Sequence, residues 1–268
     1  MEVNKESLNL LMKDGKKLSR SRIAEILGVS DSAARDYKAL LDNMPLLMSG
    51  ENGRNVLIIG DLHLPFEKNG YFEHCKAVKE KYGCNEIVFI GDIIDNHYSS
   101  FHDSDPDGMG AGKEMMAVRS AIKRWKKEFP KAKVCLCNHD LIPNRKAFNA
   151  GLSKKWIKSI KDVFRLKGWD FADSFLIDNV LYEHGVGGKA QQRSKRELVS
   201  LVQGHYHTDM YIHYTVGQNF KIFGMQVGCG VDGKAYAMEY SKYFPKPAIG
   251  CGVVLNNGTL PILEPMEL

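Results

Sequence analysis

This chain of 268 residues contains neither internal repeats nor low-complexity tracts. No apolar run approaches the roughly 20 residues that a membrane-spanning helix needs. The first residues lack the apolar core and the small-residue cleavage site of a secretory signal. The six cysteines include no CxxC pair, which indicates scattered reduced thiols rather than a disulfide framework. These absences predict a cytoplasmic protein without a membrane partner.

Charge is distributed unevenly along the chain. The apolar content of 44% and the charged content of 26% are ordinary for a soluble globular protein, and the net charge is only +5. Residues 113–167, however, contain sixteen lysines and arginines against four acids. This asymmetry favours a polyanionic partner such as nucleic acid, and a solvated helical face is the competing interpretation.

The first fifty residues contain two short helical patterns separated by a glycine. The first pattern ends at Gly28, and Ser30 is suited to cap the start of a second helix. The inner faces are marked by small or apolar residues at helical spacing, namely Ile23, Ala24, Leu27, Ala34, Tyr37 and Leu41. The arrangement resembles a helix-turn-helix, whose second helix enters the DNA major groove. That resemblance implies DNA contacts by Arg20, Arg22, Ser32, Arg35 and Lys38. A helical module that docks a protein, or the rest of the chain, is the alternative.

A segment with proline and glycine, residues 44–54, has the composition of a linker. We therefore expect a helical module over residues 1–50 and a larger domain over residues 51–268. The length of the chain is sufficient for one large and one small domain.

The most informative stretch is NVLIIGD, residues 55–61, which is followed by Leu62 and His63. A short apolar run bounded by polar residues is typical of a buried strand. If the chain leaves this strand extended, Asp61 and His63 point the same way, because they stand two residues apart. A carboxylate and an imidazole that converge at the end of a strand suit a divalent metal.

Four further apolar runs also end in polar residues that can bind metals. We expect strands at residues 86–90, 133–137, 179–182 and 198–202, with helices at 71–82 and 113–129 between them. The residues that follow these strands are Asp92, Asn138, His139, His184, His205 and His207. A single histidine is usually a satisfied core residue, but buried polar groups need partners, and packing alone does not explain the whole series. A shared pair of dications would supply those partners.

The motifs DxH, GDxxD, NHD, HG and GHxH occur in this order and resemble those of the calcineurin-like metallophosphoesterases over about residues 55–230. The resemblance implies an α/β fold, a sandwich of two sheets with helices outside and a two-metal site at one edge. Ligands of one metal correspond to Asp61, His63, Asp92 and His207. Ligands of the other correspond to Asp92, Asn138, His184 and His205, so that Asp92 bridges.

The same resemblance implies catalytic roles for two further residues. His139 matches a catalytic histidine that is not a ligand, and Asp95 matches the acid that orients it. Two dications about 3.5–4 Å apart would lower the pKa of a bridging water for in-line attack, and His139 would stabilise charge or protonate the leaving oxygen. Mixed nitrogen and oxygen ligands fit Mn²⁺, Fe, Zn²⁺ or Ni²⁺, and availability decides as much as affinity. We expect Mn²⁺, with Fe, Zn²⁺, Ni²⁺ and Mg²⁺ as alternatives.

The chain departs from the usual family pattern at one position and from the pattern of one branch of the family at two others. Cys137 stands where the family usually has glycine, and we expect it to point into the core as a small hydrophobe. A side chain there could instead disturb the turn or add a soft ligand. Asn96 and Asp140 stand where the Ser/Thr protein phosphatases carry arginine and glutamate, which favours the diesterase and nuclease-like branches.

Residues 96–112 form a polar loop of a length that is often functional, beside the expected site. His97 in this loop is a candidate substrate contact, with a plain surface histidine as the alternative. Arg145 and Lys146 follow NHD closely and are the best candidates to bind phosphate. The run 97–147 also resembles phosphoesterases found in bacteriophage genomes.

Two expectations concern packing beyond the motifs. Residues 144–168 are strongly basic and predict a helix with Trp156 and Phe164 at core spacing. Apolar runs around 249–255 and 260–263 predict a hairpin that completes the second sheet.

The leading hypothesis is a two-metal phosphodiesterase or nuclease that acts on nucleic acid. One alternative is a phosphomonoesterase or a small-nucleotide phosphodiesterase whose basic helices are merely solvated. Another is a DNA-binding regulator in which the phosphoesterase fold is catalytically silent.

Overall fold

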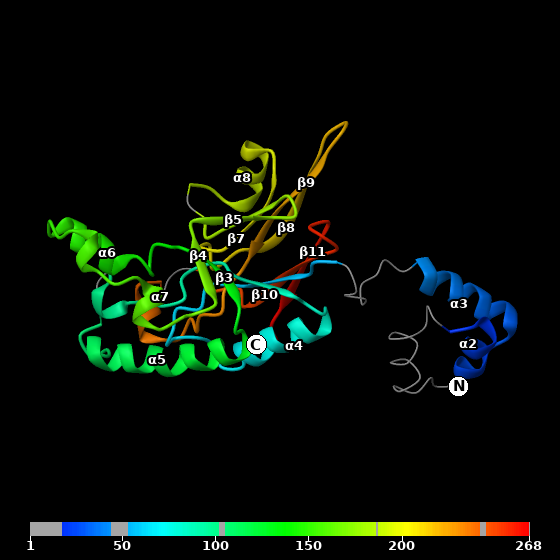
Figure 1. Cartoon of the computed structure of the whole chain (residues 1–268), viewed down its shortest axis with the longest axis horizontal. Coiled ribbons are helices and arrows are strands. Elements are labelled where there is room, and N and C mark those ends of the chain that lie inside the picture. The colour runs from blue at the N-terminus through cyan, green and yellow to red at the C-terminus, as the bar shows by residue number, and fades with distance from the viewer. Residues whose placement is uncertain (1–17, 44–52, 102–104, 186, 242–244, 268) are drawn as a thin grey trace. The chain divides into compact units, whose positions relative to one another are not determined.

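The computed structural model describes residues 18–43, 53–101, 105–185, 187–241 and 245–267. The chain divides between residues 52 and 53 into two compact units (Figure 1). Most of the predicted linker, residues 44–52, lies outside the described residues.

The first unit contains helices α2 (Arg20–Leu27) and α3 (Asp31–Asn43). Ser19 Oγ accepts a backbone N–H in the first turn of α2 at 3.3 Å, and Gly28 ends this helix in the left-handed conformation. Ser30 Oγ accepts an N–H in the first turn of α3 at 3.3 Å, which confirms the expected cap.

The two helices meet at Ile23 and Ala34, which are both fully buried. Tyr37, which we expected on the inner face, is 46% exposed. Helix α2 has only eight residues, or about 12 Å at 1.5 Å per residue, so it cannot cover the 13 residues of α3.

The residues predicted to contact DNA all belong to this unit. Arg20 and Arg22 form exposed ion pairs with Asp31 at 3.3 Å and Glu25 at 2.6 Å. The others are exposed or half-buried, namely Ser32, Arg35 and Lys38. The helix-turn-helix and its DNA contacts stay predictions.

The larger unit contains two sheets with helices outside, as predicted (Figure 1). The strands of the first sheet are β1 (Val56–Ile59), β2 (Glu86–Phe89), β3 (Ala132–Cys135), β4 (Trp169–Ala172), β10 (Gly250–Leu255) and β11 (Leu260–Pro265). Those of the second sheet are β5 (Ser174–Ile177), β6 (Val180–Glu183), β7 (Ser200–Gln203), β8 (Met210–Val216) and β9 (Lys221–Val227). The spatial orders are β11-β10-β1-β2-β3-β4 and β5-β6-β7-β9-β8.

Parallel pairing brings strand ends together at one edge of each sheet. Strands β1 to β4 are parallel neighbours, and so are β6, β7 and β9. Strand β10 pairs antiparallel with β1, so the C-terminal hairpin extends the first sheet. Our prediction that it completes the second sheet was wrong. Two neighbouring apolar runs indicate strands that pair with each other, but they do not indicate which sheet the pair joins.

The main core lies between the sheets. Val56 and Ile58 of β1 pack there with Tyr182, Val202 and Met225 of the second sheet. The intervening residues of β1 point to the opposite face, because successive side chains of a strand alternate. They are buried too, which explains why the strand reads as an unbroken apolar run.

Helices α4 (Tyr71–Lys81), α5 (Ala111–Glu128) and α8 (Ala190–Glu197) pack against the sheets. The chain also forms helices α6 (Ile142–Asn149) and α7 (Ile160–Val163) and the short 3₁₀ turns η1 (His97–Ser99), η2 (Lys154–Trp156) and η3 (Tyr236–Ser241). On α5, Trp125 stacks at 5.7 Å from the Phe129 ring and donates its N–H to Glu67 at 2.6 Å. None of the helices that the structure describes has both the length and the apolar character to cross a membrane.

The basic stretch 144–168 is not the single helix that we expected. Helix α6 ends before Gly151, whose φ is +72°, and serine caps then begin η2 and α7. Trp156 is 83% exposed and is not a core residue. Helical periodicity predicted its burial only if one helix ran through the whole stretch.

Replacing Trp125 with alanine should lower the free energy of unfolding by about 3–5 kcal/mol, because it empties a fully buried site. Urea denaturation followed by circular dichroism measures this change. Met116→Ala on the same helix is the control, since Met116 is 66% exposed and should shift stability by about 0.5 kcal/mol or less. Equal effects of the two variants would contradict the packing described here.

Candidate metal centre

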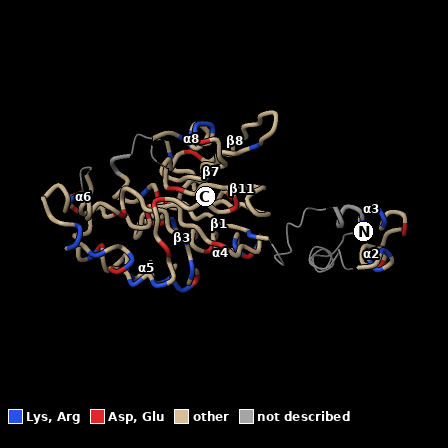
Figure 2. Tube along the Cα trace, turned by 45° about the horizontal axis from the view of Figure 1, so that its top comes forward, with Lys and Arg blue, Asp and Glu red and all other residues tan. Residues whose placement is uncertain are grey.

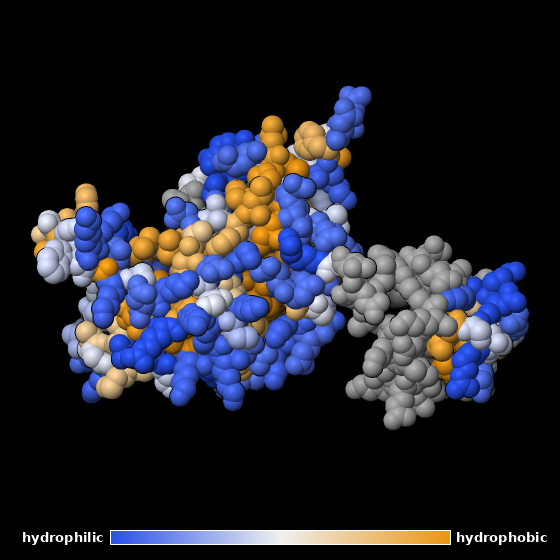
Figure 3. Space-filling view, in the orientation of Figure 1, coloured by the Kyte–Doolittle hydropathy of each residue, from blue (hydrophilic) through white to orange (hydrophobic). Residues whose placement is uncertain are grey.

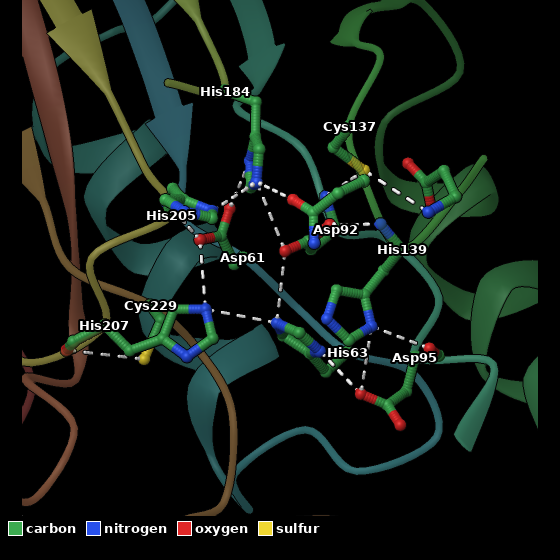
Figure 4. A network of polar contacts seen from close by, with 12 residues as sticks. Asp61, His63, Asp92, Asp95, Cys137, His139, His184, His205, His207 and Cys229 are labelled. Carbon is green, nitrogen blue, oxygen red and sulfur yellow. Dashed lines mark hydrogen bonds and ion pairs between the residues drawn. The ribbon is translucent and has the colours of Figure 1, made fainter. Parts of the chain in front are cut away.

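Five strands from both sheets end at one place, shown in Figure 4. Their ends deliver Asp61 and His63 after β1, Asp92 and Asp95 after β2, Asn138 and His139 after β3, His184 after β6, and His205 and His207 after β7. The structure thus brings together all seven residues that were predicted as metal ligands, and the two predicted catalytic residues lie beside them.

The first candidate site is formed by His63, Asp92 and His207, whose ligand atoms all lie within 4.8 Å of one another. The Nε2 atoms of His63 and His207 are 3.1 Å apart, and the latter lies 3.3 Å from Asp61 Oδ2. Metal–nitrogen bonds of about 2.1 Å at a right angle place two nitrogens about 3.0 Å apart. The spacing therefore fits two imidazoles on one cation.

The second candidate site is formed by Asp92, His184 and His205. His184 Nε2 lies 2.9 Å from Asn138 Oδ1, 3.1 Å from His205 Nδ1 and 3.3 Å from Asp92 Oδ2. One imidazole nitrogen carries a single proton or a single lone pair, so it cannot satisfy three such partners. A cation held between these atoms satisfies all of them.

Asp92 belongs to both sites. Its Oδ2 lies 3.5 Å from His63 Nε2 and 3.3 Å from His184 Nε2. Its Oδ1 accepts the backbone N–H of His139 at 3.2 Å, which fixes the carboxylate plane. This position between two histidine groups is the one that the family resemblance implied for a bridging ligand.

The buried acids are held in the ionised form. Burial raises the pKa of the Asp61 carboxyl, but His184 and His207 outweigh burial and hold this pKa well below its usual value. Burial likewise opposes ionisation of Asp92, yet His184, His139 and His63 lower its pKa to about 2. Anionic oxygens are thus available to bind cations.

The histidines divide into two groups. Burial lowers the pKa of His63, and burial together with His184 lowers the pKa of His205. Neutral rings of this kind offer a lone pair to a metal. Burial also works against a charge on His184, but Asp92 and Asp61 raise its pKa to about 9. A cation near this ring would replace the proton as the partner of both acids.

Two buried atoms at the centre have no hydrogen-bond partner among the described residues. They are Asp61 Oδ1 and His184 Nδ1, which lie 3.4 Å apart. An unsatisfied buried polar atom is costly and calls for an explanation. The residues present, with their orphaned atoms and converging donors, fit a pair of divalent cations.

Local backbone turns, and not an extended chain, aim the first ligands. The φ angles of His63 and Asp92 are +48° and +38°, in the left-handed region that non-glycine residues rarely adopt. The His63 N–H donates to the Asp92 carbonyl at 2.8 Å, so the two turns hold each other. Asp61 and His63 thus lie in one cluster, but the extended chain that we took as the condition for this is not what brings them there. Gly91, with φ +135°, is required because a Cβ atom there would overlap the His184 ring.

His139 and Asp95 are in contact, in an arrangement that differs in detail from the expected one. His139 Nδ1 donates to the backbone carbonyl of Asp95 at 2.8 Å and lies 3.6 Å from its carboxylate. The carboxylate itself is closest to His63 Nδ1, at 2.7 Å. Asp95 therefore orients two rings, one through its backbone and one through its side chain. Burial opposes a charge on His139, but Asp92 and Asp95 raise its pKa above the usual value.

Cys137 is buried, as expected, but its sulfur is not an inert filler. The Sγ atom accepts the Asp92 backbone N–H at 2.9 Å and the Asp140 N–H at 3.5 Å. It thereby supports the turn on which the shared carboxylate sits. Burial, together with Asp140 and Asp92, raises the pKa of the thiol well above its usual value, so it stays neutral. The departure from glycine was visible in the sequence, but this hydrogen bond was not.

His97 is buried and is not a surface histidine. The ring is buried, and its Nε2 accepts the Asp105 N–H at 3.1 Å. The backbone N–H groups of His97 and Tyr98 donate to the Glu114 carboxylate at 3.0 and 3.1 Å. Burial raises the pKa of Glu114 to about 6. These contacts hold the loop in place, and no local sequence signal pointed to Glu114.

Arg145 and Lys146 are exposed on α6, which begins three residues after His139. Their side chains lie over the ring of Phe101, at 4.4 and 5.5 Å from its centroid. The predicted phosphate contacts thus lie on the helix that follows His139, and they are not among the residues that form the candidate centre.

Comparison with known proteins provides the family. The description calcineurin-like phosphoesterase matches residues 54–221, which is more than half of the chain. The chain belongs to this family.

Several solved structures resemble this calcineurin-like phosphoesterase at low identity. Vacuolar Protein Sorting 29 from Cryptosporidium parvum has a TM-score of 0.44 at 14% identity, with 81% of this chain and 92% of that chain covered. Yfce, a phosphoesterase from E. coli, has a TM-score of 0.38 at 13% identity, with coverages of 78% and 98%. Pseudomonas putida nuclease MPE has a TM-score of 0.32 at 12% identity, with coverages of 79% and 87%. A comparison with curated protein sequences finds no match.

As a member of the calcineurin-like phosphoesterases, the protein is a hydrolase of a family that uses divalent metals. The His and Asp groups that could hold such ions are those described above.

Asp92→Asn should lower the amount of metal bound at both sites, because the shared carboxylate loses an anionic oxygen. His207→Ala should lower it at one site only. Metal per chain is measured by inductively coupled plasma mass spectrometry after dialysis against metal-free buffer, with the exposed Lys195→Ala on α8 as the control. Equal losses in the Asp92 and His207 variants would contradict a shared ligand.

Cys137→Ala should leave the buried Asp92 N–H without an acceptor and cost about 1–3 kcal/mol of unfolding free energy. Cys137→Ser keeps an acceptor of similar reach and should recover much of that loss. Urea denaturation of both variants checks the expectation, and an alanine variant as stable as the wild type would rule out a bracing role for the thiol.

Proposed function

We propose that this calcineurin-like phosphoesterase is a binuclear metal-dependent phosphodiesterase that acts on nucleic acid. The observation that carries the proposal is the pair of histidine groups that share Asp92, with His139 beside them. Asp61, His63, Asp92 and His207 would hold one cation. Asp92, Asn138, His184 and His205 would hold the other. We propose Mn²⁺ as the metal, with Fe, Zn²⁺, Ni²⁺ and Mg²⁺ as the alternatives, because ligands that mix nitrogen and oxygen fit several of these ions and availability decides among them.

A bound pair of divalent cations polarises a phosphoryl group, lowers the pKa of water and stabilises in-line displacement. The protein's own residues supply the remaining steps. Because His139 Nδ1 donates to a carbonyl oxygen, which can only accept, its other ring nitrogen is left to carry the mobile proton. We assign His139 the role of a general acid that protonates the leaving oxygen. Asp95 positions it and His63 at the same time.

Two observations favour a diester over a monoester. Asn96 Nδ2 donates to the His139 carbonyl at 2.9 Å, and Asp140 Oδ1 accepts the Ile94 N–H at 3.1 Å. Both side chains brace the turns around the centre, and neither supplies a positive charge. A phosphomonoester carries one more negative charge than a diester at neutral pH, so the absence of a cation at these two positions suits the diester better.

The basic stretch supports a polyanionic substrate. Lysines and arginines are concentrated on α5 and around α6, as Figure 2 shows. In the first unit, the ion pairs of Arg20 and Arg22 are exposed, so phosphates can compete for these side chains. We propose that Arg20, Arg22, Ser32, Arg35 and Lys38 contact DNA.

The proposal is tested by a substrate panel with Mn²⁺. It contains bis-p-nitrophenyl phosphate, p-nitrophenyl phosphate, and single- and double-stranded DNA and RNA. We expect turnover of diesters, and cleavage of nucleic acid that falls steeply with salt. Turnover of the monoester alone would favour a phosphomonoesterase. DNA binding without any hydrolysis would favour a catalytically silent regulator.

His139→Ala should keep both metals and lose about 10²–10⁴-fold in kcat on bis-p-nitrophenyl phosphate, because general acid catalysis has that typical value. Metal content and steady-state kinetics are measured on the same preparation. A large loss of metal in this variant would show that His139 acts as a ligand.

A further inference from the structure

One surface of the larger unit combines strong positive charge with exposed rings. It comprises residues 142–167, here called the basic lobe, which include helices α6 and α7. The lobe contains eight lysines and arginines against one acid, Asp162. In Figure 3, hydrophobic and hydrophilic atoms adjoin each other over α6.

Two aromatic rings of the basic lobe are largely exposed. Trp156 is 83% exposed and Phe148 is 72% exposed, whereas the other two tryptophans of the chain are fully buried. Lys154 and Lys155 precede Trp156 directly and are also exposed. Trp156 and Phe148 do not contribute to the hydrophobic core of this unit, so core packing does not explain why large rings occur at these positions.

A third ring lies on the adjoining loop and contacts two positively charged side chains of the lobe. Phe101 is 49% exposed, and the charged ends of Arg145 and Lys146 lie over its face. Both cations also remain exposed to solvent. The lobe therefore presents flat rings and phosphate-binding groups side by side.

The basic lobe is continuous with the candidate metal centre. Helix α6 starts at Ile142, whose N–H donates to the His139 carbonyl at 3.1 Å. A strand that lies along α6 would therefore reach the residue to which we assign proton transfer.

We propose that the basic lobe binds unpaired nucleotides of a single-stranded nucleic acid and guides the strand to the metal centre. This inference rests on the proposed function, because it names the form of its substrate. Unpaired bases stack on exposed rings, and lysine and arginine neutralise the neighbouring phosphates. In a duplex the faces of the bases are already covered by other bases, so the rings favour a single strand. An anionic membrane surface also attracts tryptophan and lysine, but it does not explain why the lobe begins at Ile142, which is hydrogen-bonded to His139.

Binding is measured first, without catalysis. A fluorescein-labelled oligothymidylate is titrated with the full-length protein in EDTA, and fluorescence anisotropy is followed. Trp156→Ala should weaken binding about 5- to 100-fold, since loss of one stacked base has that effect. Phe220→Ala is the control, because Phe220 is an exposed ring, 46%, away from the lobe between β8 and β9. Lys155→Glu should reduce the salt dependence of binding, and Lys195→Glu on α8 should not.

Catalysis is measured next, with Mn²⁺ present. Trp156→Ala should lower kcat/KM on the single strand by a similar factor and leave hydrolysis of bis-p-nitrophenyl phosphate unchanged. A duplex of the same sequence should bind more weakly than the single strand, with little effect of Trp156→Ala.

Several results would overturn the inference. They are unchanged oligonucleotide affinity in Trp156→Ala, equal or tighter binding of the duplex, and binding to phosphatidylserine vesicles that depends on Trp156 when oligonucleotide binding does not. Self-association in sedimentation that Trp156→Ala abolishes, with oligonucleotide affinity unchanged, would also overturn it. Failure to hydrolyse any phosphoester is a different result, because it refutes the proposed function while the titration in EDTA still reports on the lobe.

Discussion

The larger unit depends on one buried carboxylate, Asp92, that lies between two groups of histidines. A charge removed from water is costly unless it is paired, and Asp61 lies in the same cluster with a second negative charge. The surrounding imidazoles offset part of this cost and hold the pKa of Asp92 at about 2, although burial works the other way. Among the residues that the structure describes, Asp61 Oδ1 and His184 Nδ1 have no hydrogen-bond partner and only face each other at 3.4 Å. A pair of cations is the simplest complement to this arrangement of charges.

The fold explains how residues so far apart in sequence reach one point. Parallel strands of each sheet deliver their carboxyl ends to one edge, and packing of the sheets brings the two edges together. Tight turns then do the fine positioning. The turns at His63 and Asp92 have left-handed backbone conformations. Gly91 leaves room for the His184 ring beside the second turn, and the Cys137 thiol accepts the Asp92 N–H. The polar residues at the strand ends are candidate metal ligands, and the strands before them are apolar because both of their faces are buried.

Much of this could be predicted from sequence, because the ligand types and the apolar runs are local signals. The predictions that failed depended on contacts between segments that are distant in the sequence or on the exact ends of helices. An extended DxH segment was a reasonable reading of spacing two, but a hydrogen bond to the Asp92 carbonyl turns the backbone at His63. Helical periodicity placed Trp156 in the core, but the segment breaks near Gly151, so the register on which that inference depended is lost. The C-terminal hairpin was visible as a pattern, whereas its partner strand β1 was not.

The candidate ligands come from both layers of the fold, with Asp61 and Asp92 following strands of one sheet and His184, His205 and His207 following strands of the other. Any ion coordinated there would link the two sheets. A ligand that binds only the native state stabilises that state, so tighter metal binding would also raise the free energy of unfolding of this unit. In a cell, scarcity of the right metal would then reduce the lifetime of the protein as well as its turnover.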